Sequence, residues 1–239
     1  MKQLKNGAIL KFYEFISPFL SHNIIQQDKL PGHSALLISA AAGDEAIGAA
    51  GTILSHISEG GQFTTLYCSQ TTGKEVKESE KTALMLGSKV NHFLPFAKGS
   101  LSKSSKFPQS LAKAIEKINP DVVLIPSMME TNADNAAISE ALVKIRKKID
   151  LDFMIMAYSV WMPIMPNCIF DISKVWNEKK SVLDYCSILQ TAQPAKDYVK
   201  VAEGINQYWG QSVSPNIKYA EAFLMATAQK YISMARKAL

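Results

Sequence analysis

Short apolar runs alternate with helical stretches along most of the 239-residue chain. Apolar or β-branched runs bounded by turn residues are typical of buried strands, whereas apolar residues spaced three and four apart indicate helices. The pattern predicts strands at residues 35–39, 63–68, 90–94, 121–125 and 154–161, the last being the final strand of the core. It predicts helices at about 46–57, 75–86, 108–118, 134–149, 173–191 and 220–238, with a further helical segment at 197–208.

This alternation favours a mainly parallel sheet that is covered by helices on both faces. We therefore expect an α/β fold, a Rossmann-like three-layer sandwich with a helical C-terminal part. Residues 1–34 are expected to form an N-terminal helical extension, and residues 35–239 a single domain. In such sheets the ligand site lies beyond the carboxyl ends of the strands. The loops that follow Ser39 and Ile125 are the two places to look for chemistry.

The charge of the chain argues against nucleic acid as a partner. The net charge is +5, but only two of the 26 basic residues are arginines, Arg146 and Arg236. Dedicated nucleic-acid readers depend on the planar arginine fork, and a lysine-rich surface is more typical of solvation. We expect no nucleic-acid partner.

The distribution of cysteine and of apolar residues predicts a cytoplasmic protein. Cys68, Cys168 and Cys186 are odd in number and widely spaced, which suits a reducing compartment. No apolar run approaches the roughly 20 residues of a membrane span. Lys11 and Glu14 interrupt the first apolar stretch before a signal-peptide core forms.

The loop after the first core strand carries two acids and two glycines. Asp44 and Glu45 stand at the predicted start of a helix, where the helix dipole favours negative charge. On spacing alone they are an ordinary first-turn acid pair. Gly48 and Gly51 lie three residues apart inside this helix, which indicates close packing against the sheet.

These residues belong to a longer pattern that resembles the LmbE-like (PIG-L) family of sugar N-deacetylases. After its first strand the family carries Pro-His-Pro-Asp-Asp-Glu-x-x-Gly-x-Gly-Gly-Thr-Ile, and a second motif, His-Pro-Asp-His, precedes a helix rich in small residues. Here the second motif is matched by residues 131–138, after the strand that ends at Pro126. The first motif is matched by Ser39, Asp44, Glu45, Gly48, Gly51, Thr52 and Ile53.

The last third of the chain extends the resemblance, so that it covers about residues 35–225 and implies an LmbE-like fold. The matching segments follow the family's order at residues 160–163, 166–167, 171–172, 206–208 and 219–223, together with Trp176 and the Lys179-Lys180 pair.

The resemblance implies a zinc site with three protein ligands and a metal-bound water. In the family these ligands are a histidine and an aspartate from the first motif and the last histidine of the second. They fall on Ala41, Asp44 and Asn135 in this chain. Only Asp44 is retained, so it is the one metal ligand expected if a metal binds, and zinc is not expected as a cofactor.

The two proton-transfer groups of the family are missing as well. The general base falls on Gly43 and the assisting acid on Asn132, so no catalytic residue is predicted with either role. The internal aspartate of the second motif is retained as Asp134. A ligand-binding cleft is still expected at the same loops, formed by Asp44, Glu45, Glu130, Asn132, Asp134 and Asn135.

Other residues offer few replacements for the missing groups. The oxygens of Asp44, Glu45, Glu130 and Asp134 could form a weak magnesium- or calcium-like site. Ser39 and Ser127 have no histidine partner for a hydrolytic triad. Cys68 is expected to be a buried structural thiol. The four histidines are expected to be structural or solvent-exposed; they are His22, His33, His56 and His92.

The sequence therefore predicts a degenerate sugar N-deacetylase homologue that binds a carbohydrate, or acts as a regulatory or scaffold protein. An amino-sugar derivative is the natural ligand by analogy. One alternative is an active metal-dependent deacetylase with a rebuilt site, or another reaction in the inherited cleft. Another is an interaction module that pairs with an active paralogue or with a second copy of itself.

Overall fold

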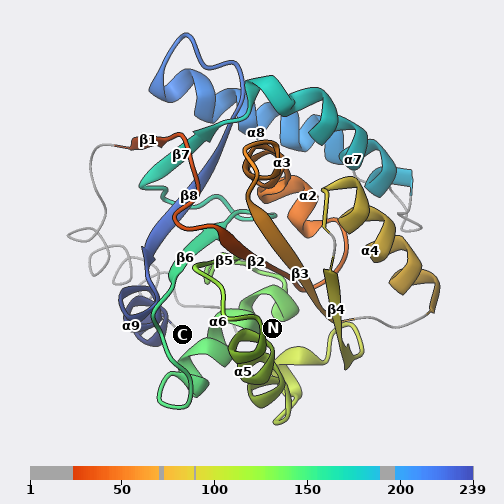
Figure 1. Ribbon diagram of the computed structural model, residues 1–239, viewed down its shortest axis with the longest axis vertical. Coiled ribbons are helices and arrows are strands. Elements are labelled where there is room, and N and C mark those ends of the chain that lie inside the picture. Colours follow the sequence, from red (N-terminus) through yellow and green to blue (C-terminus); the bar gives the residue numbers. More distant parts are fainter. Residues whose placement is uncertain (1–23, 70–72, 89, 189–196, 239) are drawn as a thin grey trace.

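The computed structural model describes residues 24–69, 73–88, 90–188 and 197–238 (Figure 1). Their strands form one sheet in the order β1-β7-β8-β6-β5-β2-β3-β4. The strands are β1 (Ile25–Gln27), β2 (Ser34–Ser39), β3 (Gln62–Ser69), β4 (Val90–Phe96), β5 (Val122–Pro126), β6 (Met154–Tyr158), β7 (Cys168–Asp171) and β8 (Ala220–Thr227). The α-helices are α2 (Asp44–Gly48), α3 (Ala50–Ser58), α4 (Gly73–Met85), α5 (Phe107–Ile118), α6 (Ala133–Ile145), α7 (Trp176–Ile188), α8 (Tyr198–Val213) and α9 (Ala228–Ala238), with 3₁₀ turns η2 (Leu101–Lys103) and η3 (Ser173–Val175).

The sheet is mainly parallel, as predicted. β2 pairs in parallel with β3 on one side and β5 on the other, and β5 pairs in parallel with β6. Only β8 runs antiparallel, between β6 and β7, among the strands of the described ranges. Since β2 and β5 are neighbours, the loops that follow them leave the sheet side by side. This brings the two predicted motifs together.

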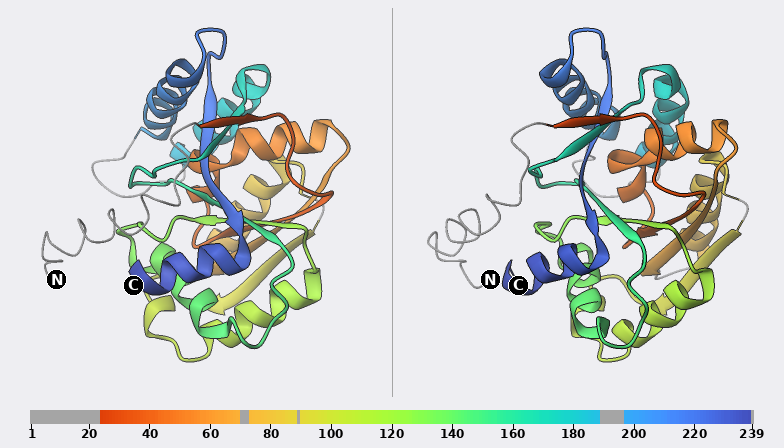
Figure 2. Two further views of the ribbon diagram at one scale, coloured as in Figure 1. Left: turned by 90° about the vertical axis from the view of Figure 1, so that its left-hand side faces the viewer. Right: turned by 60° about the vertical axis from the view of Figure 1, so that its left-hand side comes forward.

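Helices cover both faces of the sheet and complete the predicted three-layer sandwich (Figures 1 and 2). On one face α2, α3, α7 and α8 pack around Leu37, Ile53 and Leu183. On the other face α5, α6 and α9 pack around Ile38, Leu111 and Tyr231. The residues of β2 alternate between these two clusters, as the period of a strand buried on both faces requires.

The prediction of one helix over residues 220–238 is wrong for its first eight residues, which form β8. Alanine, leucine, methionine and glutamate are good helix formers, so local propensity favoured a helix. Pairing with a strand on each side overrides that propensity, because it buries most of the segment within the sheet. For the same reason β6 is not the last core strand, and the C-terminal part is not purely helical.

The predicted helix at 46–57 is broken at Ala49, which has φ −142° and ψ −4°. Two buried side chains bind the backbone groups at the break. Lys179 Nζ donates to the carbonyl of Ile47 at 2.8 Å, and Glu221 accepts from the amides of Gly51 and Thr52 at 2.8 and 2.7 Å. Lys179 and Glu221 also pair at 2.6 Å. Side chains from α7 and β8 therefore hold the break between α2 and α3 in place.

The two glycines beside this break have the predicted packing role. A Cβ at Gly48 would lie 2.3 Å from the ring of Tyr158 in β6, and one at Gly51 would lie 2.7 Å from Ile172. The space beside each of these glycines is too small for the methyl group of an alanine.

The helical prediction for residues 1–34 rests mainly on residues 1–23, which lie outside the described residues. Ile25–Gln27 is a strand, paired in parallel with β7, and so differs from that prediction. No helix within the described ranges has both the length and the apolar character that crossing a bilayer requires.

Candidate functional site

The loop after β2 places its two acids in different environments. Glu45 is fully buried, whereas Asp44 is partly exposed. Glu45 accepts hydrogen bonds from the hydroxyl of Tyr67 at 2.7 Å and from the amide of Gly43 at 3.1 Å. Glu45 is thus a structural group that holds its own loop against β3.

The Ser39 hydroxyl also lies close to Glu45. It is 2.6 Å from the carbonyl oxygen of Ala41 and 2.9 Å from Oε2 of Glu45. Burial raises the pKa of Glu45, with the bonds from Tyr67 and Ser39 acting in the opposite direction.

Asp44 is the acid of this loop that remains available. Burial raises its pKa to about 7, and the nearby acids Glu45 and Glu130 act in the same direction. The Asn135 amide and Lys98 oppose the shift. Asp44 therefore changes its charge close to neutral pH, which is the property of a group that can exchange a proton with a ligand.

The family's base position adopts a backbone that excludes most residues. Gly43 has φ +101° and ψ −27°, in the left-handed region that glycine tolerates and a residue with a Cβ adopts only with strain. This turn places the Gly43 amide against Glu45. An aspartate at position 43 would therefore strain this loop.

In the second motif, two of the three polar residues are used for structure. Asn132 caps α6 by accepting from the amides of Asp134 and Asn135 at 2.9 and 3.3 Å. The Asp134 carboxylate accepts from the amides of Gly99 at 2.6 Å and Leu101 at 3.0 Å. It thereby fixes the loop after β4 onto the start of α6.

Asn135 differs from its neighbours. Its side chain is fully buried, and neither its nitrogen nor its oxygen has a partner in good hydrogen-bond geometry among the described residues. The amide lies close enough to Asp44 to lower the pKa of that carboxyl. A buried amide without partners is costly, so this position calls for a ligand or solvent.

Glu130 also has a structural role. Its carboxyl accepts from the amide of Val160 at 2.7 Å and from that of Trp161 at 3.3 Å, and so holds the segment after β6. Burial raises its pKa, while these amide bonds lower it.

The four acids predicted as a possible magnesium or calcium site do not converge on one point. Glu45, Glu130 and Asp134 each turn toward separate backbone or hydroxyl donors. No group of three or more histidine, cysteine, aspartate or glutamate side chains in the described parts of the chain is arranged to hold a metal ion. The structure gives no support to that site.

The residues at the family's zinc positions do not fit zinc either. They offer the methyl group of Ala41, the carboxyl of Asp44 and the amide of Asn135. An amide oxygen is a weak ligand for zinc compared with imidazole, and a methyl group is none.

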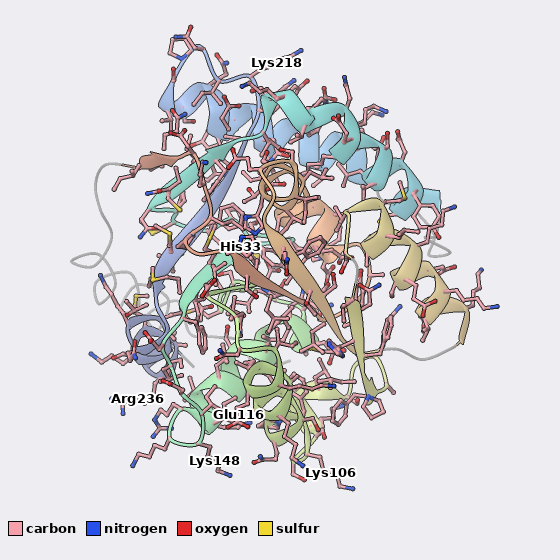
Figure 3. All side chains as sticks on the ribbon, in the orientation of Figure 1. His33, Lys106, Glu116, Lys148, Lys218 and Arg236 are labelled. Carbon is pink, nitrogen blue, oxygen red and sulfur yellow. The ribbon has the colours of Figure 1, made fainter. Side chains whose placement is uncertain are left out.

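Of the four histidines, the three within the described residues lie where the sequence predicted. His56 is buried, with Nε2 3.2 Å from the carbonyl oxygens of His33 and Gln62, and so has a structural role. His33 is exposed at the start of β2, at the opposite end from Asp44, and is labelled in Figure 3. His92 lies in β4, and His22 lies outside the described residues.

The serine and cysteine candidates are buried. The Ser127 hydroxyl accepts from the amide of Met129 at 3.2 Å. Cys68 is fully buried, and burial raises the pKa of its thiol, as expected of a structural cysteine. Neither offers a nucleophile.

Two features of the site region were missed from the sequence. Lys98 lies in the loop that Asp134 holds against α6, and the lysine pairs with Glu75 at 2.5 Å. The buried pair of Lys179 and Glu221 was noted only as part of a family pattern. The one indication of this pair in the sequence was Glu221, a glutamate inside the apolar segment 219–223. A helix that exposes Glu221 to solvent would have explained that glutamate equally well.

The fold is an α/β three-layer sandwich like that of LmbE-like deacetylases, and the candidate site lies at the carboxyl ends of β2 and β5. The model of the PIG-L family, described as GlcNAc-PI de-N-acetylase, matches residues 36–146 of this chain. A comparison with curated protein sequences gave no match.

Solved structures support the same fold. The N,N'-diacetylchitobiose deacetylase of Pyrococcus horikoshii is 18% identical, with a TM-score of 0.70 and 97% of each chain covered. A conserved protein of Thermus thermophilus is 22% identical, with a TM-score of 0.68, covering 80% of this chain and 93% of that one. The 4-carboxy-2-hydroxymuconate hydratase of Pseudomonas putida is 21% identical, with a TM-score of 0.62, covering 82% and 96%. At these identities the likeness concerns the fold, which hosts more than one chemistry.

Proposed function

We propose that this protein binds a small carbohydrate-type ligand at the carboxyl ends of β2 and β5 and does not carry out zinc-dependent hydrolysis. The observation that carries the proposal is the donor set at the family's metal positions, a methyl group, one carboxyl and one amide at Ala41, Asp44 and Asn135. A catalytic zinc site needs three good protein ligands and an open position.

Ligand binding is supported by the polar groups that the described part of the fold leaves without partners. Asn135 is buried with both side-chain polar atoms unpaired, and Asp44 beside it is partly exposed. A carbohydrate is the preferred ligand because hydroxyl groups both donate and accept hydrogen bonds. The Pyrococcus protein, a diacetylchitobiose deacetylase by name, makes this choice reasonable by analogy.

The test measures amide hydrolysis and sugar binding on the same preparation. The protein, with and without added zinc, is incubated with N,N'-diacetylchitobiose, and the release of acetate is followed. We expect no release above a protein-free blank, while titration calorimetry detects binding of a monosaccharide that Asn135→Leu weakens. Zinc-dependent acetate release that Asp44→Ala abolishes would refute the proposal.

A second function is a reaction in which Asp44, partly exposed beside the buried Asn135, acts as an acid or base; burial raises the pKa of this carboxyl to about 7. A carboxyl that titrates there can act as a general acid or base at neutral pH. The hydratase on the same fold supports a reaction of another class in the inherited site. Such an enzyme would show a rate profile with an inflection near pH 7 that Asp44→Asn removes.

A further inference from the structure

We infer that the groove between β4 and α5 binds a small amphiphilic carboxylate, of the kind that a medium-chain fatty acid represents. The groove shares no lining residue with the loops after β2 and β5. The inference therefore goes beyond the proposed function and does not depend on it.

The groove lies at one edge of the sheet. It has a volume of about 300 Å³ and is lined by residues of β3, β4 and α5. This volume is at the lower end of the range for small-molecule sites. Among the described strands β4 is the last on this side of the sheet, so none of them closes the groove from outside (Figure 1).

The floor of the groove is apolar. Leu66 from β3 is fully buried, and the half-buried side chains of Leu94, Ala114 and Ile118 pack against the same core cluster. Because these three side chains are only half-buried, they keep apolar surface that a ligand can remove from water, which is favourable. The floor is thus suited to a hydrocarbon chain.

The rim of the groove is cationic and polar. Ser110, Lys113 and Lys117 follow one another on α5 at spacings of three and four, which places them on one face of the helix. His92 from β4 lines the same groove. Both lysines are exposed, and neither takes part in an ion pair with the described residues. The rim offers ammonium and hydroxyl donors to an anion.

The described lining of the groove contains no acid that would repel an anion. Glu116, the acid of α5, lines a separate cavity together with Asp121 and Asp150. A carboxylate at the rim can therefore accept hydrogen bonds from the lysines while its hydrocarbon chain covers the floor. A second copy of this chain, docked through the same face, would bring like charges together and is disfavoured.

The experiment compares octanoate, octan-1-ol and octylamine, which share one hydrocarbon chain and differ in charge, by titration calorimetry at low salt. We expect octanoate to bind about tenfold more tightly than the other two, because it alone accepts charge-assisted hydrogen bonds from the rim. Lys113→Gln combined with Lys117→Gln should reduce the affinity for octanoate to that for octan-1-ol.

The matched control is Lys147→Gln combined with Lys148→Gln, which removes the same charge from two exposed lysines after α6 (Lys148 is labelled in Figure 3). It should leave the preference for octanoate intact. The melting temperatures of both double variants should match that of the wild type, which excludes a folding defect as the cause of lost binding.

Three results would overturn the inference. They are failure of octanoate to bind, equal affinity for octanoate and octan-1-ol, and a preference that survives the loss of Lys113 and Lys117 or is weakened equally by the control. None of them bears on the proposed function, because the groove is separate from the candidate site.

Discussion

At the scale of single residues, the site combines retained positions with new roles. Asp44 and Asp134 both match the family pattern, yet only Asp44 remains accessible, because Asp134 accepts from two amides of the loop after β4. Glu45 is a structural acid that accepts hydrogen bonds from the Tyr67 hydroxyl and the Gly43 amide. The identity of a residue at a motif position therefore does not fix its function. The hydrogen bonds that it makes decide whether it is available.

The backbone of Gly43 leads to a prediction at this scale. Gly43→Ala should destabilise the protein by about 1–2 kcal/mol, because alanine is strained at φ +101°. Gly204→Ala is the matched control: Gly204 lies exposed within α8 with no atom near its Cβ position, so alanine should stabilise the protein by about 0.5–1 kcal/mol. Urea denaturation measures both. A neutral Gly43→Ala would contradict the assigned loop conformation.

At the scale of elements, the break between α2 and α3 connects the core to the site. The buried pair of Lys179 from α7 and Glu221 from β8 binds the backbone on both sides of Ala49. The first turn of α2 carries Asp44, so this pair sets the direction in which the site loop leaves the core. In this way α7 and β8, which are distant from the site loop in sequence, help to position that loop.

Removing one residue of the Lys179–Glu221 pair should strongly destabilise the protein. Lys179→Met leaves the Glu221 carboxylate buried without its counter-ion, and we expect a loss of about 3–5 kcal/mol in the free energy of unfolding. Adding Glu221→Gln to that variant should recover part of the loss. Lys180→Met is the control, because Lys180 pairs with Asp184 in solvent, and it should cause no measurable change. Equal effects at Lys179 and Lys180 would show that the buried pair has no special role.

At the scale of the whole molecule, much of the fold was predictable because strands such as β2 and β5 are short, apolar and bounded by turns. The exception was β8, whose helix-forming residues are held in a strand by pairing with β6 and β7. That pairing is a property of the tertiary structure and leaves no local signal. The break at Ala49 was missed for the same reason.

The sequence indicated candidate residues in the loops after β2 and β5, but not how the fold holds each of them. The family resemblance led us to expect one cleft at the two motifs, whereas the adjacency of β2 and β5 is known only from the structure. The sequence could not show that Glu130 is bound by amides after β6, or that Asn135 is buried without partners in the described structure. Such facts depend on the packing of loops, which periodicity does not encode.

Our central proposal is that this protein lacks the zinc site of the LmbE-like deacetylases whose fold it shares. Its most direct test is the metal content of protein purified without chelator, measured by mass spectrometry before and after dialysis against zinc. The account predicts less than about a tenth of an equivalent of zinc in both samples, because Asp44 alone of the family's three ligands is retained. Near-stoichiometric zinc that Asp44→Ala removes would contradict it.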